Sequence, residues 1–181
     1  MKFPSVTTVL SPFSDFSMIR PEVLKRAAER GTRVHSACSA YGLGLGLWSC
    51  SMEKGDMPFY CSFLKWVEAI EPSFLSVEEE FKDDCLGYMG HPDAVISISR
   101  EKRLTVIDYK TPMSISRSWF PQVAAYAHLA RGCGYDVHRG LAVRLRRNGG
   151  TPIVTEVDID GEPWAAFMNA LGAYKYFNTG K

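Results

Sequence analysis

The stretch GYMGHPDAVISISREKRLTVIDYKTP, residues 87–112, decides both the fold and the chemistry expected of this chain. Two segments rich in β-branched residues, 87–99 and 103–111, flank the polar link REK and predict a β-hairpin. Asp93 follows a proline in the first segment, and Asp108 and Lys110 interrupt the apolar run of the second. Ionised groups beside a core are costly unless they are paired or bind a metal. The stretch therefore predicts a site as well as a hairpin.

Strand geometry brings these charges together. Side chains alternate between the two faces of a strand, so Asp108 and Lys110 share one face and Tyr109 points to the other. A hairpin centred near Glu101 would bring Asp93 opposite Asp108. Pro92 suits a place where a strand bends or lacks a ladder donor.

Two convergent carboxylates repel each other, so each needs a cation. Sites rich in oxygen ligands suit Mg²⁺ or Mn²⁺. Lys110 adds a positive charge that can hold a phosphate or a water nucleophile. These are the groups that metal-assisted phosphodiester hydrolysis requires.

The segments around the hairpin predict an α+β fold with one mixed central sheet flanked by helices. Helical periodicity covers residues 20–42, where Gly31 suggests a break between two helices, and also residues 58–72, 118–134 and 162–177. A further strand is expected over 74–81, forming an antiparallel meander with the hairpin, and a second hairpin is expected around residues 148–150. Residues 5–10, SVTTVL, predict a short strand or an extended lead-in. We expect a single domain over 1–181, with an N-terminal helical region (residues 1–72) and a sheet core with flanking helices (residues 73–181).

Length and composition indicate an ordinary globular protein. The chain has 181 residues, 46% of them hydrophobic and 23% charged, and no apolar run approaches the roughly 20 residues that span a bilayer. The N-terminus carries no long apolar segment typical of a signal peptide, so we expect a cytoplasmic protein without a membrane partner. The five cysteines are odd in number and form no CxxC pair, which favours reduced thiols over a zinc or iron-sulfur site.

Charge is segregated along the chain although the net charge is only +1. Residues 53–93 hold ten acidic and three basic side chains, whereas residues 100–147 hold ten basic and three acidic ones. A nearly neutral protein of this kind can present a basic face to a polyanion. Four arginines are candidates for tracking phosphates, with a solvated hairpin as the alternative: Arg139, Arg144, Arg146 and Arg147.

Several motifs together resemble the PD-(D/E)XK nuclease superfamily. HPD at 91–93, fourteen residues, then DYK at 108–110 is similar to its signature. QVAAYA (122–127) resembles the QxxxY motif of the RecB-type exonuclease branch, and RGTRVH (30–35) resembles its helical histidine motif. Glu80 matches an acidic position common in that branch, and the expected element order fits the αβββαβ core of the restriction-endonuclease-like fold.

The resemblance implies a Mg²⁺- or Mn²⁺-dependent deoxyribonuclease and a role for each matching position. Asp93, Asp108, His35 and the main-chain carbonyl of Tyr109 would bind the metal. Lys110 would position or activate the attacking water, and Gln122 and Tyr126 would orient Lys110, the water or the DNA backbone. Glu80 would bind metal through water or pair with a basic neighbour. Some relatives hold an iron-sulfur cluster through cysteines near the C-terminus; no cysteine follows Cys133 here, so no cluster is expected.

We expect an exonuclease that acts on DNA ends or single strands in repair, recombination or phage replication. Two alternatives stay open, a nuclease-like module that binds DNA or protein without cutting, and a structure-specific endonuclease. Taken singly, each motif also has a purely structural interpretation, for example a turn at Asp93 or an exposed edge strand at Asp108. The sequence predicts neither the cleavage polarity, nor the strand preference, nor the oligomeric state.

Overall fold

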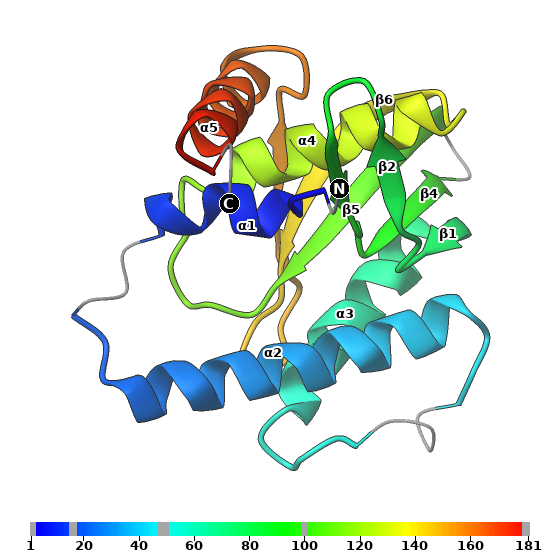
Figure 1. Ribbon diagram of the computed structural model, residues 1–181. Helices are drawn as coiled ribbons and strands as arrows, with labels where there is room; N and C mark the ends of the chain where they lie inside the picture. Colours follow the sequence, from blue (N-terminus) through cyan, green and yellow to red (C-terminus); the bar gives the residue numbers. More distant parts are fainter. Residues whose placement is uncertain (1–2, 15–17, 47–50, 99–100, 179–181) are drawn as a thin grey trace.

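The protein is described by a computed structural model that covers residues 3–14, 18–46, 51–98 and 101–178 (Figure 1). It confirms an α+β fold with a central mixed sheet flanked by helices. The helices are α1 (Val6–Leu10), a 3₁₀ turn (Ser11–Phe13), α2 (Pro21–Gly42), α3 (Met57–Ile70), α4 (Trp119–Gly132) and α5 (Glu162–Asn178). The strands are β1 (Pro72–Val77), β2 (Phe81–Asp83), β3 (Tyr88–Gly90), β4 (Ala94–Ile98), β5 (Glu101–Lys110), β6 (Val137–Arg144) and β7 (Ile153–Val157).

The main sheet has the strand order β1-β4-β5-β6-β7. The pair β5–β6 is parallel, and the other neighbours are antiparallel. Parallel neighbours need a crossover connection, and α4 supplies it between β5 and β6. This crossover places α4 directly over the strand that carries Asp108 and Lys110.

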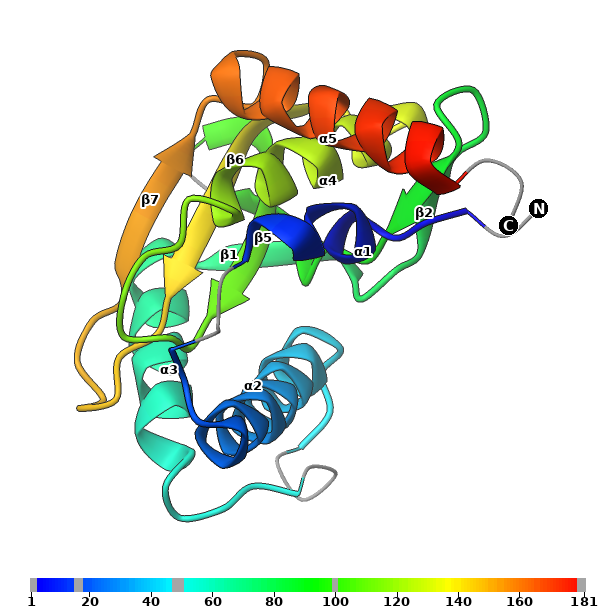
Figure 2. The same ribbon diagram turned by 60° about the vertical axis from the view of Figure 1, so that its left-hand side comes forward.

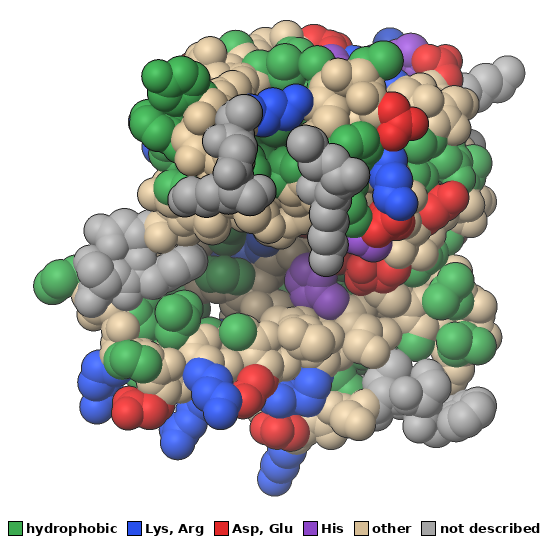
Figure 3. All heavy atoms as spheres, viewed as in Figure 1, with side chains coloured by type: hydrophobic (Ala, Val, Ile, Leu, Met, Phe, Trp, Pro, Cys, Tyr) green, Lys and Arg blue, Asp and Glu red, His purple; other side chains and the backbone are tan. Residues whose placement is uncertain are grey.

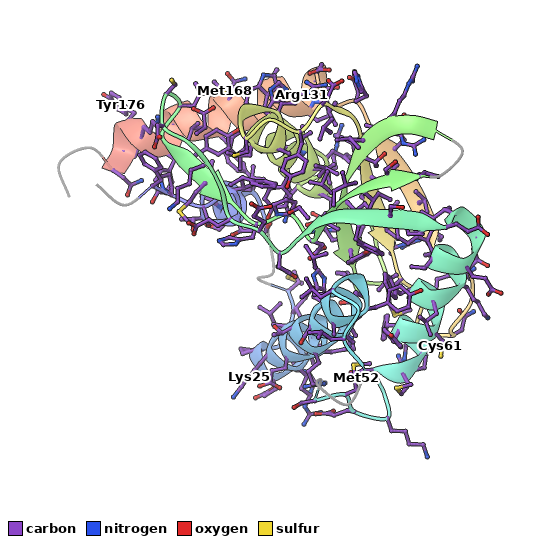
Figure 4. All side chains as sticks on the ribbon, turned by 90° about the vertical axis from the view of Figure 1, so that its right-hand side faces the viewer. Lys25, Met52, Cys61, Arg131, Met168 and Tyr176 are labelled. Carbon is purple, nitrogen blue, oxygen red and sulfur yellow. The ribbon has the colours of Figure 1, made fainter. Side chains whose placement is uncertain are left out.

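Helices cover the two faces of the sheet (Figures 1 and 2). On one face α1, α4 and α5 enclose a core that includes Val123, Leu129 and Phe167. On the other face α2 and α3 enclose a second core that includes Phe63, Trp66 and Tyr109. Figure 4 shows this division, with Arg131 and Met168 on the α4 and α5 side and Lys25 and Met52 on the α2 side.

Helix α2 buries side chains in the core only in its second half. Its buried residues are Val34, Ala37, Cys38 and Ala40, whereas none of residues 21–33 is buried. The helix runs unbroken through Gly31, so the break expected there is wrong. No helix within the described residues is long and apolar enough to cross a membrane.

The register of the central hairpin agrees with the prediction. Ala94 pairs with Ile107 and Val95 with Val106, so Asp93 and Asp108 face one another one residue further on. The register shifts between Ser97 and Ile98 near the turn, away from the charged end.

The expected antiparallel meander is confirmed in its pairing, since β1, β4 and β5 are consecutive antiparallel neighbours, but the extents of its first two strands differ from the prediction. The strand expected over 74–81 ends at Val77, because Glu78 adopts a left-handed backbone conformation with φ 52°. The segment 87–99 is divided at His91-Pro92-Asp93 into β3 and β4, since Pro92 cannot donate a ladder hydrogen bond. Strands β2 and β3 pair with each other in a separate two-stranded sheet, and β1 pairs with β4.

The N-terminal segment also differs from the expectation. Residues 6–10 form helix α1, because the Ser5 hydroxyl accepts a hydrogen bond from the Thr8 N–H at 3.1 Å and caps its first turn. Val6, Val9 and Leu10 pack into the core beneath α4 and α5. The N-terminal helical region is therefore not one spatial unit, since α1 lies across the sheet from α2 and α3.

Candidate functional site

Asp93 joins helix α2 to strand β5. It lies just before β4 and is 5% exposed. Its Oδ1 is 2.7 Å from His35 Nδ1 on α2, and its Oδ2 accepts the main-chain N–H of Tyr109 on β5. One carboxylate thus fixes the position of the histidine relative to the central hairpin.

Glu78 completes a group of three potential metal ligands with His35 and Asp93. One ligand atom from each of the three side chains lies within 4.8 Å of the other two. Glu78 stands at the turn after β1, where its N–H donates to the Asp93 carbonyl at 3.2 Å and its Oε1 accepts from the Ser39 hydroxyl at 3.0 Å. Carboxylate oxygens with one imidazole nitrogen are a donor set suited to a divalent cation.

The charges within this group shift the pKa values of two of its members. Burial lowers the pKa of His35, but the adjacent Asp93 carboxylate outweighs that effect and raises it to about 9. Burial and the repulsion from Asp93 raise the pKa of Glu78. A bound cation would take the place of the imidazole proton and offset the repulsion between the carboxylates.

Asp108 and Lys110 form a second, connected network with helix α4. The Lys110 ammonium lies against Asp108 Oδ2 and donates to Gln122 Oε1 at 2.9 Å. Gln122 Nε2 donates to Asp108 Oδ1 at 3.2 Å and to the Tyr126 hydroxyl at 3.1 Å. The Lys110 Nζ also lies 5.8 Å from the centre of the Trp119 ring, within the range of a cation–π contact. The orientation of the lysine is therefore set by Asp108 on its own strand and by the first turns of α4.

Asp108 lies in an environment that disfavours its ionised form. It is 4% exposed, and burial raises its pKa although Lys110 acts in the opposite direction. Its Oδ2 makes no hydrogen bond of normal geometry within the described residues, despite the adjacent Lys110 ammonium. This oxygen has capacity left for a further positive ligand. Asp108 does not belong to the group of His35, Glu78 and Asp93, because its carboxylate is turned to Lys110 and Gln122.

Of the two roles expected for Glu80, the structure shows the pairing with basic neighbours and not membership of the three-ligand group. Glu80 pairs with Lys82 at 2.7 Å and with His91 at 3.3 Å and does not join the site. Glu78, to which the sequence assigns no role, is the third member of that group. Residues 78–80 are three consecutive glutamates, so the sequence does not show which of them lies near His35 and Asp93. The left-handed backbone conformation at Glu78 determines that it is this one. Trp119 and Ser39 were also missed, and no motif in the sequence marks them.

The four candidate arginines fall into two places. Arg144, Arg146 and Arg147 line one pocket at the ends of β5 and β6. Arg139 lies five residues before Arg144 on β6, about 16 Å away along the strand, where its Nε donates to Thr105 Oγ1 at 3.3 Å. It does not join the other three. The aromatic residues Phe59, Tyr60 and Trp66 of α3 are buried in the core, so their rings are not exposed for stacking against a base.

The three-ligand group opens into a cleft beside α2. The cleft has a volume of about 550 Å³ and is lined by Gly31, Thr32, His35, Ser36, Ser39 and Glu78. Figure 3 shows the molecule hollowed between α2 and the body above it, with a histidine (purple) and acidic side chains (red) at the hollow. The small and hydroxyl-bearing residues of α2 leave two of the potential metal ligands, His35 and Glu78, at the wall of the cleft, whereas Asp93 is buried behind them.

Tyr109 carries a buried hydroxyl whose contribution to stability can be measured. Its ring packs in the core against Phe63 and Trp66, and its hydroxyl is buried without a hydrogen bond within the described residues. Because an unsatisfied buried hydroxyl does not stabilise the fold, Tyr109→Phe is expected to leave the free energy of unfolding unchanged or to raise it by up to about 1 kcal/mol. Urea denaturation measures this. A decrease of more than about 1 kcal/mol would contradict the expectation, since it would mean that the hydroxyl has a stabilising partner.

Comparisons with known proteins add little to this geometry. No protein family and no curated protein matches the chain. Among solved structures, the one titled "Crystal structure of SSO0001" matches with a TM-score of 0.44 and 15% sequence identity. The match covers 70% of this chain and 60% of that chain, less than two thirds of its length. No function is transferred from it.

Proposed function

We propose that the protein is a divalent-metal-dependent nuclease that hydrolyses phosphodiester bonds in DNA, acting from ends as an exonuclease. The observation that carries the proposal is that the three-ligand group and the lysine network lie side by side at one end of the central hairpin. The possible metal ligands His35, Glu78 and Asp93 stand beside the lysine network of Asp108, Lys110 and Gln122. The resemblance to PD-(D/E)XK nucleases, residue by residue, supports the same reaction.

The residues present fit a Mg²⁺ or Mn²⁺ ion. Hard carboxylate oxygens dominate, and the single imidazole of His35 is a ligand that Mn²⁺ accepts more readily than Mg²⁺ does. Asp108 Oδ2, which makes no normal hydrogen bond within the described residues, is available as an additional ligand. When bound, the ion would polarise the scissile phosphate and lower the pKa of a coordinated water.

The side chains have separate tasks in this proposal. Lys110 holds the attacking water and stabilises the negative charge that develops on the phosphate. Gln122 fixes the lysine ammonium by accepting its hydrogen bond, and Tyr126 fixes Gln122 in turn. Asp93 holds His35 in place through the 2.7 Å contact, so the ligands on α2 and beside β4 move as one body.

The test is the degradation of end-labelled DNA in the presence of Mn²⁺ or Mg²⁺, with EDTA as the control. Linear single- and double-stranded substrates, each labelled at the 5′ or the 3′ end, report polarity and strand preference. A circular substrate separates an exonuclease, which leaves it intact, from an endonuclease, which cuts it. Binding of DNA without any metal-dependent cleavage would replace the proposal by a non-catalytic binding module.

The neighbouring glutamates provide a matched pair of variants. Glu78→Gln is expected to weaken Mn²⁺ binding about tenfold or more, because it removes one carboxylate from the three-ligand group. Glu80→Gln is expected to leave it unchanged, because Glu80 is occupied by Lys82 and His91. Isothermal titration calorimetry measures both affinities. Equal affinities in the two variants, or a larger loss for Glu80→Gln, would remove Glu78 from the proposed site.

A further inference from the structure

A second pocket lies where β5 and β6 end, on the far side of the crossing between α2 and β5. Its volume is about 290 Å³, and its lining includes Phe59, Thr111, Arg144, Arg146, Arg147 and Asn148. We call it the arginine pocket. Among the described residues, no aspartate or glutamate lines it. Three arginines that line one pocket without a carboxylate favour an anion as the ligand.

Nearby charges strengthen this preference. Arg30 of α2 places its guanidinium 5.2 Å from the centre of the Phe59 ring, and its Nε is buried without a hydrogen-bond partner within the described residues. Across the same residues, no ion pair neutralises Arg30, Arg144, Arg146 or Arg147, since the arginines found in ion pairs are Arg33 and Arg131. Uncompensated cations at one pocket produce a local positive potential.

The turn that carries two of these arginines is anchored to α3. The Arg146 N–H donates to Ser62 Oγ at 3.0 Å, and Lys65 Nζ donates to the Gly149 carbonyl at 2.7 Å. Arg144 is fixed separately, because its guanidinium donates to the Met113 carbonyl. A pocket whose backbone is already ordered loses less conformational entropy when it binds a ligand.

The arginine pocket begins one residue beyond the lysine network. Arg144 pairs with Lys110 in the parallel register of β5 and β6, and the Leu145 N–H donates to the Lys110 carbonyl at 2.8 Å. A methyl group placed on Gly31 would lie 3.7 Å from Thr111 Oγ1, so α2 crosses the end of β5 at this point. Gly31 lines the cleft of the metal ligands and Thr111 lines the arginine pocket, so the two cavities adjoin where these residues meet.

We infer that the arginine pocket binds a backbone phosphate of the same nucleic-acid strand whose scissile phosphate lies at Lys110. The strand would extend from the cleft of α2 to the end of β6, with the pocket holding a phosphate that is not cleaved. The identity of the ligand as a strand phosphate rests on the proposed nuclease function. The preference for an anion rests on the arginines alone.

The test measures binding of a fluorescent single-stranded oligonucleotide by anisotropy over a series of salt concentrations, in EDTA to prevent cleavage. Arg146→Gln/Arg147→Gln is the variant, because both side chains are exposed and their replacement leaves the core intact. Arg103→Gln/Lys54→Gln is the matched control, which removes the same charge from exposed positions outside the pocket. The pocket variant is expected to bind at least about tenfold more weakly and to reduce the salt slope by about 0.7 for each phosphate that it no longer neutralises. Equal affinities of variant and control would overturn the inference.

Oligonucleotides with one neutral methylphosphonate linkage then locate the bound phosphate. At one linkage, neutralisation should weaken binding to the wild type but not to the pocket variant, because the variant no longer holds that phosphate. If no linkage behaves in this way, and a deoxynucleoside monophosphate binds in a manner that depends on Arg146 and Arg147, the pocket is a site for free nucleotide and the strand assignment is wrong.

Cleavage by the same proteins separates this inference from the proposed function. With Mn²⁺, the pocket variant is expected to raise KM and to retain kcat, because it lacks a group that binds the strand and keeps the lysine network. A wild type that binds DNA through these arginines but never cleaves it would refute the nuclease proposal and leave the pocket standing. A wild type and variant that cleave with the same KM would refute the pocket and leave the nuclease proposal standing.

Discussion

Replacing Lys110 by methionine is expected to lower the rate of DNA cleavage by about 10²–10⁴-fold, the range for the removal of a positioned proton-transfer or charge-stabilising group. The ammonium is the cation nearest to Asp108, and Gln122 holds it with a 2.9 Å hydrogen bond. Methionine retains much of the chain length and removes the charge. Asp108→Asn is expected to cause a similar decrease, because it removes the charged partner of the lysine and the additional metal ligand that we propose.

The measurement is single-turnover cleavage of labelled DNA with enzyme in excess over substrate. Removing one charge from a buried pair leaves the other uncompensated, so each single variant is also expected to lose stability. The double variant Asp108→Asn/Lys110→Met leaves no unpaired charge, and it should fold well and remain inactive. Lys25→Ala, at an exposed lysine on the outer part of α2 (Figure 4), is the control and should cleave at the wild-type rate. A well-folded double variant that cleaves DNA at the wild-type rate would refute the proposed site.

The alternation of side chains along a strand and the spacing of residues on a helix were sufficient to predict the central hairpin and the lysine network. Alternation along β5 placed Asp108 and Lys110 on one face, and the spacing of Gln122 and Tyr126 on a helix placed them one above the other. The hydrogen bonds found among these four side chains follow from those two periodicities and from the crossover of α4 over β5. The register that brings Asp93 to Asp108 was likewise predictable, because a short link between two strands fixes the register of the hairpin.

Features that depend on residues distant in sequence were not predictable. The choice of Glu78 over Glu80 depends on a left-handed turn after β1 and on the position of His35, which comes from another helix. The continuity of α2 through Gly31 arises because tertiary packing of its second half outweighs the low helix propensity of glycine.

Gly90→Ala is expected to lower the free energy of unfolding by about 1–3 kcal/mol, the usual cost of overpacking a core. A methyl group on Gly90 would lie 2.7 Å from Tyr126 Cε1 and 3.1 Å from Leu129 Cδ1. Both neighbours are buried, and neither ring nor methyl group has solvent into which it can move. Because the Tyr126 hydroxyl accepts a hydrogen bond from Gln122 at 3.1 Å, displacement of the ring should also reduce turnover in the fraction of protein that is folded.

Gly132→Ala is the matched control, because a methyl group there meets no atom within 4 Å. Its stability in urea denaturation is expected to equal or slightly exceed that of the wild type. Combining Gly90→Ala with Tyr126→Leu should cost less than the sum of the two single changes, since the smaller side chain removes the overlap, with a coupling of about 0.5–3 kcal/mol. Additive effects would show that Gly90 and Tyr126 do not press on one another. A non-additive effect on stability would show that β3 packs directly against the Tyr126 ring, and so that the small β2–β3 sheet helps to hold the side chain that Gln122 contacts.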